Sequence, residues 1–462
     1  MSNPAVEAER AETALRRAAL SPRTAKLAAL TFAAAVTVYL GIAAYRASDE
    51  TQYELRLIPY LAYDDRVDFA YFYAAADMVW HGDLDEVYPE KHEYIFYPGD
   101  PAFDLIGDEY VKARLLTRGN YYNPPLVAIL QAPLTLLGFK WAFWTFSLIS
   151  AGAFAAFVLL FWWLGRGIPE LPLVLLGTVA FQPVHEAIIM GHLSLFFVFA
   201  LGAGFFALRA DRPVLAGLLL SLLALKPQWA ILPGLFLLVR GEWRALASMG
   251  LAAMLLFFAP FLVAGFGTFA DYVEFLRGQS SVDVGNAPHM FSWNGFLSKL
   301  EANQIAEVYT ADVNEPLLYA LQALTLAVVV IVWLGRDLYL GVAATIVGML
   351  LLSTHSVWYD WAFLVVAAAA LTLRPAPAGV RAQLWVLLLA LFISSSQSVD
   401  TVFAPDGRHG FIHWSEAGFF SVTLVSFALL LWCAGRAVLE GRLQLPSIPW
   451  PRAARTLRPR PD

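Results

Sequence analysis

Residues 316–334, PLLYALQALTLAVVVIVWL, form a long apolar stretch without a single charged side chain. A helix of about 20 such residues can cross the roughly 30 Å hydrocarbon core of a bilayer. Similar runs recur between residues 27 and 434. Of the 462 residues, 59% are hydrophobic and only 15% are charged, whereas soluble domains carry about 25% charged residues. The sequence therefore predicts an all-α polytopic integral membrane protein and excludes an ordinary soluble globule.

Basic residues at both ends of the chain predict its orientation. Segment 1–26 carries five Arg and Lys against three acids, and the tail 435–462 carries six Arg against two acids. Cytoplasmic flanks of membrane helices are enriched in Lys and Arg, so we expect both termini in the cytoplasm and an even number of spans in the cell membrane. The first run, 27–45, reads as an uncleaved signal anchor. We expect one transmembrane domain over 27–434.

Twelve crossings fit the alternation of apolar runs and basic links. One region is ambiguous, because 123–139 is short and contains three prolines, and the runs 213–225 and 227–240 are also short. Either the short pair is a shallow hairpin, or it is one kinked helix and 123–139 crosses instead. The loops 46–120 and 265–315 are predicted to lie outside. The expected spans lie near 27–45, 141–163, 171–190, 192–208, 213–225, 227–240, 243–264, 316–334, 338–354, 358–373, 382–398 and 414–434.

The first outer loop contains an acid-rich and aromatic-rich segment, DDRVDFAYFYAAADMVWHGDLDEVY (64–88). Its central part predicts an amphipathic helix near the membrane interface, with Asp68 in the first turn and Gly82 ending it. A carboxylate at this position can accept the proton of a hydroxyl at the membrane surface. The same acid can instead satisfy the helix dipole and its free N–H groups. Asp64 and Asp65 are close enough to substitute for Asp68.

Four segments in order resemble glycosyltransferase family 87. The first outer loop is similar to the family's Asp-Phe…Gly…Tyr signature, and YYNPPLVAILQAPLTLL is similar to its Tyr-x-Pro-Pro…Pro segment. A central block that opens at Gly191-His192 and reaches Leu225-Lys226-Pro227 resembles another, with His192 standing where the family usually has Gln. The late segment STHSVWYDWAFLV completes the set. The four segments lie at 67–88, 121–137, 191–246 and 353–365.

The resemblance implies a fold, a reaction and a site. The fold is a GT-C-type bundle with extracytoplasmic amphipathic helices. The reaction is transfer of a hexose, mannose by family precedent, from a polyprenyl-phosphate-linked donor to an outer glycan or glycolipid acceptor, with inversion and without a cofactor. Asp68 matches the family's proposed catalytic base. The partners expected are the donor, the acceptor and the lipid bilayer, and no nucleic acid.

Several further polar residues are candidates for substrate binding. Lys226 interrupts an apolar region, which is costly in a membrane and points to function, here binding the donor phosphate; a lysine can also extend its amine to the interface. His355 can donate to phosphate, and Asp360 can orient it or bind the acceptor, although an aromatic belt at the membrane interface explains this neighbourhood equally well. The remaining candidates for substrate binding or support are Tyr359, His192, His185 and Tyr122.

Other chemistries find little support in the sequence. It lacks a Cys/His cluster, and Asp83-x-Asp85 is a weak acidic pair, so no metal is expected. A Walker motif is also missing. A secondary transporter or permease is the alternative from another class. It would show inverted repeats and charges near the bilayer midplane, whereas here the ionisable groups collect on one side.

Overall fold

The computed structural model describes residues 68–83, 87–88, 121–279, 290–301, 313–394 and 416–440. Every named element in these ranges is a helix, and one β-bridge joins Met290 and Val357. Five helices are long and apolar enough to cross a membrane by length and composition, and six shorter helices are also apolar. The all-α, membrane-helix prediction is thus confirmed for this part of the chain. The predicted span 27–45, the two chain termini, Asp64 and Asp65 lie outside the described residues.

The first described helix, α3 (Asp68–His81), begins and ends where the sequence predicts, and Gly82 follows it with φ +92°. This helix differs from the predicted amphipathic helix, which would bury only one face. Eight of its residues are buried, including the run from Phe72 to Ala76. α3 packs on α6 (Pro125–Gln131), on the 3₁₀ helix η3 (Ala132–Leu137) and on α7 (Gly138–Leu164). The small alanines let these neighbours approach closely, so the helix is enclosed by protein.

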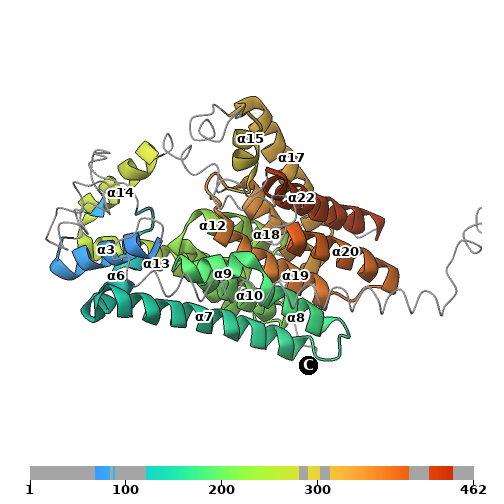
Figure 1. The fold of residues 1–462 in the computed structure, drawn as a ribbon, viewed down its shortest axis with the longest axis horizontal. Helices are drawn as coiled ribbons and strands as arrows, with labels where there is room; N and C mark the ends of the chain where they lie inside the picture. Colours follow the sequence, from blue (N-terminus) through green and yellow to red (C-terminus); the bar gives the residue numbers. More distant parts are fainter. Residues whose placement is uncertain are drawn as a thin grey trace, which may run out of the picture.

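The segment 125–164 resolves one of the ambiguities of the sequence. α6 and η3 lead directly into α7, and Gly138, with φ +70°, joins them. The 27 residues of α7 cover about 40 Å at 1.5 Å per residue. Figure 1 shows α7 along one side of the helical body, with α3 and α6 at one end and α8 at the other. The proline-containing 123–139 region is therefore a short lead into a long helix.

The central part of the chain follows the predicted runs, with one extra break. The predicted span 171–190 is divided at Phe181, whose ψ of 115° is extended and whose successor begins a new helix at Gln182-Pro183. Gly241 ends one helix in the left-handed conformation that glycine tolerates. The elements are α8 (Leu171–Ala180), α9 (Gln182–Ile189), α10 (Ser194–Arg209), α11 (Pro213–Leu220), η4 (Ser221–Leu225), α12 (Gln228–Arg240) and α13 (Trp243–Ala264).

The C-terminal part contains the helices that close the bundle. Asp337 caps one of them, because its Oδ1 accepts from the backbone N–H groups of Tyr339 and Leu340 at 3.0 and 3.1 Å. The segment 265–315, which the sequence predicts to lie outside, contributes two helices, α14 and α15. The elements are α14 (Phe266–Gln279), α15 (Trp293–Glu301), α17 (Glu315–Leu334), α18 (Leu338–Leu352), η6 (Trp358–Phe363), α19 (Leu364–Leu373), α20 (Ala378–Ser394) and α22 (Glu416–Leu439).

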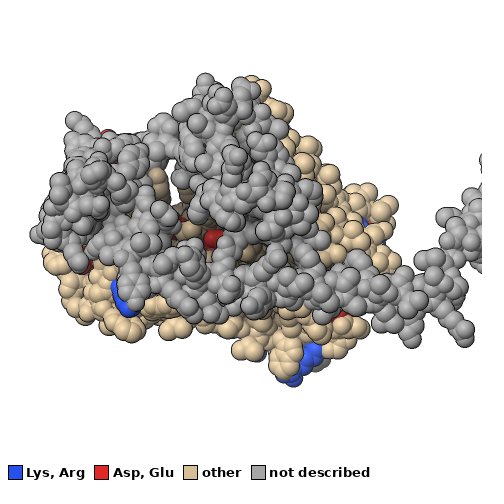
Figure 2. Space-filling model, in the orientation of Figure 1, with Lys and Arg blue, Asp and Glu red and all other residues tan. Residues whose placement is uncertain are grey.

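Large apolar side chains cover much of the outer surface of these helices. On α13, Leu251, Leu255 and Leu262 are 66%, 61% and 68% exposed. In a soluble protein such a surface would drive aggregation, whereas in a bilayer it contacts lipid. Figure 2 shows that the described residues on one face carry few charged atoms. The core lies where α10, α18 and α19 meet, and every residue of α19 is buried.

Residues 213–240 form a hairpin with Lys226 and Pro227 at its tip. The Oγ of Ser248 donates to the carbonyl of Val214 at 3.1 Å, so the start of α11 lies against the first turns of α13. α12 ends at Arg240, three residues before α13 begins. Both open ends of the hairpin therefore lie beside the start of α13. This arrangement matches the shallow-hairpin alternative, and the 13 residues of α12 cover about 20 Å.

Candidate active site

The start of α3 is fixed against the turn between α9 and α10. The backbone N–H of Phe69 donates to the carbonyl of Met190 at 3.0 Å. Gly191 has φ +60°, and a Cβ built there would lie 2.6 Å from the Cβ of Phe69. The Phe69 ring also contacts those of Phe143 and Phe146. Only glycine allows this approach, so Gly191 places Asp68 beside the turn that contains His192.

The carboxylate of Asp68 lies beside Tyr359, whose hydroxyl donates a hydrogen bond to it. Its Oδ2 atom is buried and has no hydrogen-bond partner among the described residues. Burial raises the pKa of Asp68 and outweighs the Tyr359 bond and the charges of Lys226 and His355, which lower it. A carboxylate with a raised pKa and one unengaged oxygen is a stronger proton acceptor than an ordinary exposed one.

Lys226, at the hairpin tip, forms a buried ion pair with Asp360. Its Nζ lies 3.2 Å from Asp360 Oδ2, and the two residues are 8% and 0% exposed. The ammonium also lies 5.5 Å from the ring centroid of Trp229. A buried ammonium needs a partner of opposite charge, and Asp360 supplies it from 134 residues away. The amine therefore binds Asp360 inside the protein.

His192 and Ser194 continue this polar cluster. The Ser194 Oγ lies 2.8 Å from Asp360 Oδ1 and 2.7 Å from His192 Nδ1. The His192 ring lies on that of Tyr359, with centroids 4.0 Å apart, and is 4% exposed. Ser194 was missed by the sequence analysis. Its only sequence signal is a hydroxyl at the first position of an apolar helix, two residues after a histidine.

His355 and Tyr122 lie at the edge of the same cluster. Their rings are 5.9 Å apart, and Tyr122 also contacts Phe275 of α14 at 5.8 Å. The charge of His355 acts on both Asp68 and His192. His185 is different, because its Nε2 lies 2.8 Å from the carbonyl of Val179, a local contact between α8 and α9. The structure thus brings Asp68, Tyr359, Asp360, Lys226, His192 and His355 together, with Tyr122 beside them.

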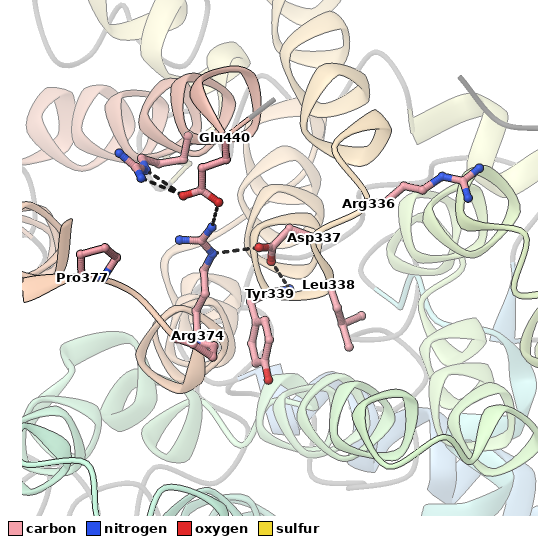
Figure 3. A pocket seen from close by; sticks show the side chains of 9 residues that line it. Arg336, Asp337, Leu338, Tyr339, Arg374, Pro377 and Glu440 are labelled. Atoms are coloured by element: carbon pink, nitrogen blue, oxygen red, sulfur yellow. Dashed lines mark hydrogen bonds and ion pairs between the residues drawn. The ribbon is translucent and has the colours of Figure 1, made fainter. Parts of the chain in front are cut away.

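A second ionic cluster lies at the other end of α18 and α19. Arg374 binds Asp337 through Nε at 3.0 Å and Glu440 through Nη2, while Arg436 binds Glu440 at 2.7 Å. Figure 3 shows Arg374 between the two carboxylates in a cavity of about 630 Å³. Burial alone would raise the pKa of Glu440, but its bonds to Arg436 and Arg374 lower it. None of these ion pairs was predicted from the sequence.

The described residues contain no group of three or more His, Cys, Asp or Glu side chains that could hold a metal ion.

The comparison with known protein families gives one match. The model of glycosyltransferase family 87 matches residues 121–357, just over half of the chain. No curated protein and no solved structure matches the chain. Lys226, His192 and His355 lie inside the matched range, while Asp68 and Asp360 lie outside it and meet them only in three dimensions. This helical membrane protein belongs to glycosyltransferase family 87.

Proposed function

We propose that this glycosyltransferase moves a hexose, specifically mannose, from a polyprenyl-phosphate donor to an extracytoplasmic glycan or glycolipid, with inversion at the anomeric carbon. The observation that carries the proposal is the unengaged Oδ2 of Asp68 next to the Lys226–Asp360 pair. An acid beside a buried ammonium offers a base for the acceptor and a positive charge for the phosphate.

The chemical step follows from these two groups. Asp68 takes the proton of an acceptor hydroxyl as that oxygen attacks C1 of the donor sugar. The bond between C1 and the phosphate oxygen breaks, and its electron pair leaves with polyprenyl phosphate. The hydrogen bond between Tyr359 and Asp68 orients the base. Such general-base catalysis typically contributes about 10² to 10⁴ in rate.

Lys226 is proposed to bind the donor phosphate, together with His355. An ammonium has three N–H donors, and Asp360 faces one side of it. Lys226→Met keeps most of the apolar stem and removes the charge, so we expect donor binding to weaken by at least about tenfold, the loss of one charge-assisted hydrogen bond. Equilibrium binding of polyprenyl-phosphate-mannose to the purified protein measures this. Unchanged affinity would leave Lys226 as a structural partner of Asp360.

The basic residues at one end of the helical bundle indicate which side of the membrane the site faces. Arg240 Nη1 donates to the carbonyl of Arg336 at 2.7 Å, and Arg381 pairs with Glu170 at 3.4 Å. These contacts gather the basic links at the end opposite Lys226 and Asp360. By the positive-inside rule that end faces the cytoplasm. We propose a GT-C-type domain over 27–434, with twelve crossings, both termini cytoplasmic, and Asp68 on the outer side of the cell membrane.

The experiment that tests the reaction is transfer of radiolabelled mannose from polyprenyl-phosphate-mannose in membranes that overproduce the protein. Asp68→Asn keeps size and shape but cannot take a proton, so transfer should fall by about 10² to 10⁴. Asp77→Asn, on the same helix and paired with His81 at 3.7 Å, is the matched control and should stay near wild type. Full transfer by Asp68→Asn would show that Asp68 is not the catalytic base. If the wild type consumes no lipid-linked sugar, the proposed transfer reaction is wrong and the permease alternative is favoured.

A further inference from the structure

Ser194 lies within hydrogen-bond distance of both His192 and Asp360, but its hydroxyl cannot donate to both of them. Ser194 Oγ lies within hydrogen-bond distance of Asp360 Oδ1, at 2.8 Å, and of His192 Nδ1, at 2.7 Å. A serine hydroxyl has one proton, and it can donate to only one of these atoms. The other contact needs its proton from the partner. Either Asp360 is protonated and donates to Ser194, or His192 carries a proton on Nδ1.

The Lys226–Asp360 ion pair decides between these two arrangements. Protonating Asp360 would leave a buried ammonium, 3.2 Å away, without a counter-charge. A proton on His192 Nδ1 instead gives up the hydrogen bond that the backbone N–H of Ser194 donates to Nδ1 at 3.2 Å. An unpaired buried charge costs more than one unpaired N–H at the first turn of a helix. Ser194 therefore donates to Asp360, and His192 Nδ1–H donates to Ser194.

The remaining nitrogen of His192 then carries a lone pair. The ring is 4% exposed, and a buried imidazolium would need a counter-charge of its own, whereas Asp360 already pairs with Lys226. The ring is thus neutral, with one proton, and that proton is on Nδ1. Among the described residues, Nε2 has no hydrogen-bond partner. The ring also lies on Tyr359, whose hydroxyl holds Asp68.

We propose that Ser194 holds His192 in its Nδ1–H form, so that Nε2 accepts a hydrogen bond from a hydroxyl of the sugar substrate. This inference rests on the proposed transferase reaction and adds a specificity contact to it. His192 contacts the substrate, and Ser194 is a positioning residue that acts through His192. Because Nε2 only accepts, the site selects a substrate with a hydroxyl there and disfavours the deoxy sugar.

The tautomer can be measured without any activity. Protein labelled with ¹⁵N-histidine is placed in bilayers, and nitrogen spectra of the wild type and of His192→Gln are subtracted to isolate the His192 signals. We expect a neutral ring protonated at Nδ1. In Ser194→Ala the Nε2–H form should become populated, because the backbone N–H of Ser194 can then bond to an unprotonated Nδ1. A wild-type ring protonated at Nε2 would overturn the proposal, whether or not the protein transfers sugar.

A double-mutant cycle tests the consequence for catalysis. Ser194→Ala should lower kcat/KM by about five- to tenfold, the value of one oriented hydrogen bond. In the His192→Gln background, where an amide oxygen accepts without a tautomer, it should cost less than about twofold. Ser221→Ala, which removes a buried hydroxyl bonded to the Leu218 carbonyl, is the matched control. Equal losses from Ser194→Ala in both backgrounds would make Ser194 a purely structural residue. If the tautomer is as predicted but no sugar is transferred, the proposed function fails instead.

Discussion

The two ionic clusters at opposite ends of α18 and α19 differ in how completely their carboxylates are paired. Around Arg374, the carboxylates of Asp337 and Glu440 both have cationic partners, and the pKa of Glu440 is lowered. Around Lys226, Asp360 is paired, but Asp68 keeps one buried oxygen without a partner and its pKa is raised. A fully paired cluster joins helices. A cluster with one oxygen left open can bind and react.

The largest effect on stability is expected at the paired cluster. Arg374→Met would leave Asp337 and Glu440 without their shared partner, and removing one member of a buried ion pair costs about 3–5 kcal/mol. Thermal unfolding in detergent measures this loss, and transfer per folded molecule should stay near wild type. Arg381→Met is the control, because its pair with Glu170 is about 30% exposed and should contribute about 0–1 kcal/mol. A normal melting temperature for Arg374→Met would contradict a structural role.

A smaller effect, confined to the site, is expected from the glycine that positions Asp68. Gly191→Ala introduces a Cβ against Phe69 at a left-handed φ, which must displace the start of α3. Misplacement of a catalytic group by about 1 Å costs about 10²-fold in turnover. Gly82→Ala is the matched control, since Gly82 also has a positive φ but nothing lies within 4 Å of its Cβ. Equal turnover for both variants would show that the α9–α10 turn does not position the base.

The smallest effect is a shift in pH dependence. Because burial raises the pKa of Asp68, transfer should be lost on acidification at a pH above about 3.9, the ordinary value for aspartate. The Tyr359 hydrogen bond lowers that pKa, so Tyr359→Phe should move the acid limb to higher pH. The measurement is kcat/KM against pH for the two proteins. A limb that moves to lower pH would reverse the assignment of Asp68 as the titrating base.

The sequence predicted the elements of this fold better than their contacts. The runs at 316–334 and 338–354 are helices within two residues of their predicted ends, because uninterrupted apolar composition marks a membrane helix by itself. The break at Phe181 was missed, since the apolar run continues through it. The enclosure of α3 was also missed, because its neighbours lie more than 40 residues further along the chain.

The site shows the same limit. Asp68, Lys226 and His355 were each singled out as charged or polar groups in unusual surroundings, and the structure brings them into one electrostatic cluster. The partners could not be predicted. The pairing of Lys226 with Asp360 joins positions 134 residues apart, and the bond from Ser194 to Asp360 spans 166. Composition and spacing along the chain carry no information about such distant pairs.

The most direct test of the contrast between the clusters is one crossed measurement. Purified wild type, Asp68→Asn and Arg374→Met are assayed side by side for mannose transfer per folded molecule and for melting temperature. The account predicts that Asp68→Asn loses about 10² to 10⁴ in transfer and keeps its melting temperature, while Arg374→Met loses stability and keeps transfer. If Asp68→Asn instead unfolds early and its folded fraction transfers mannose at the wild-type rate, the open carboxylate is structural and the account is contradicted.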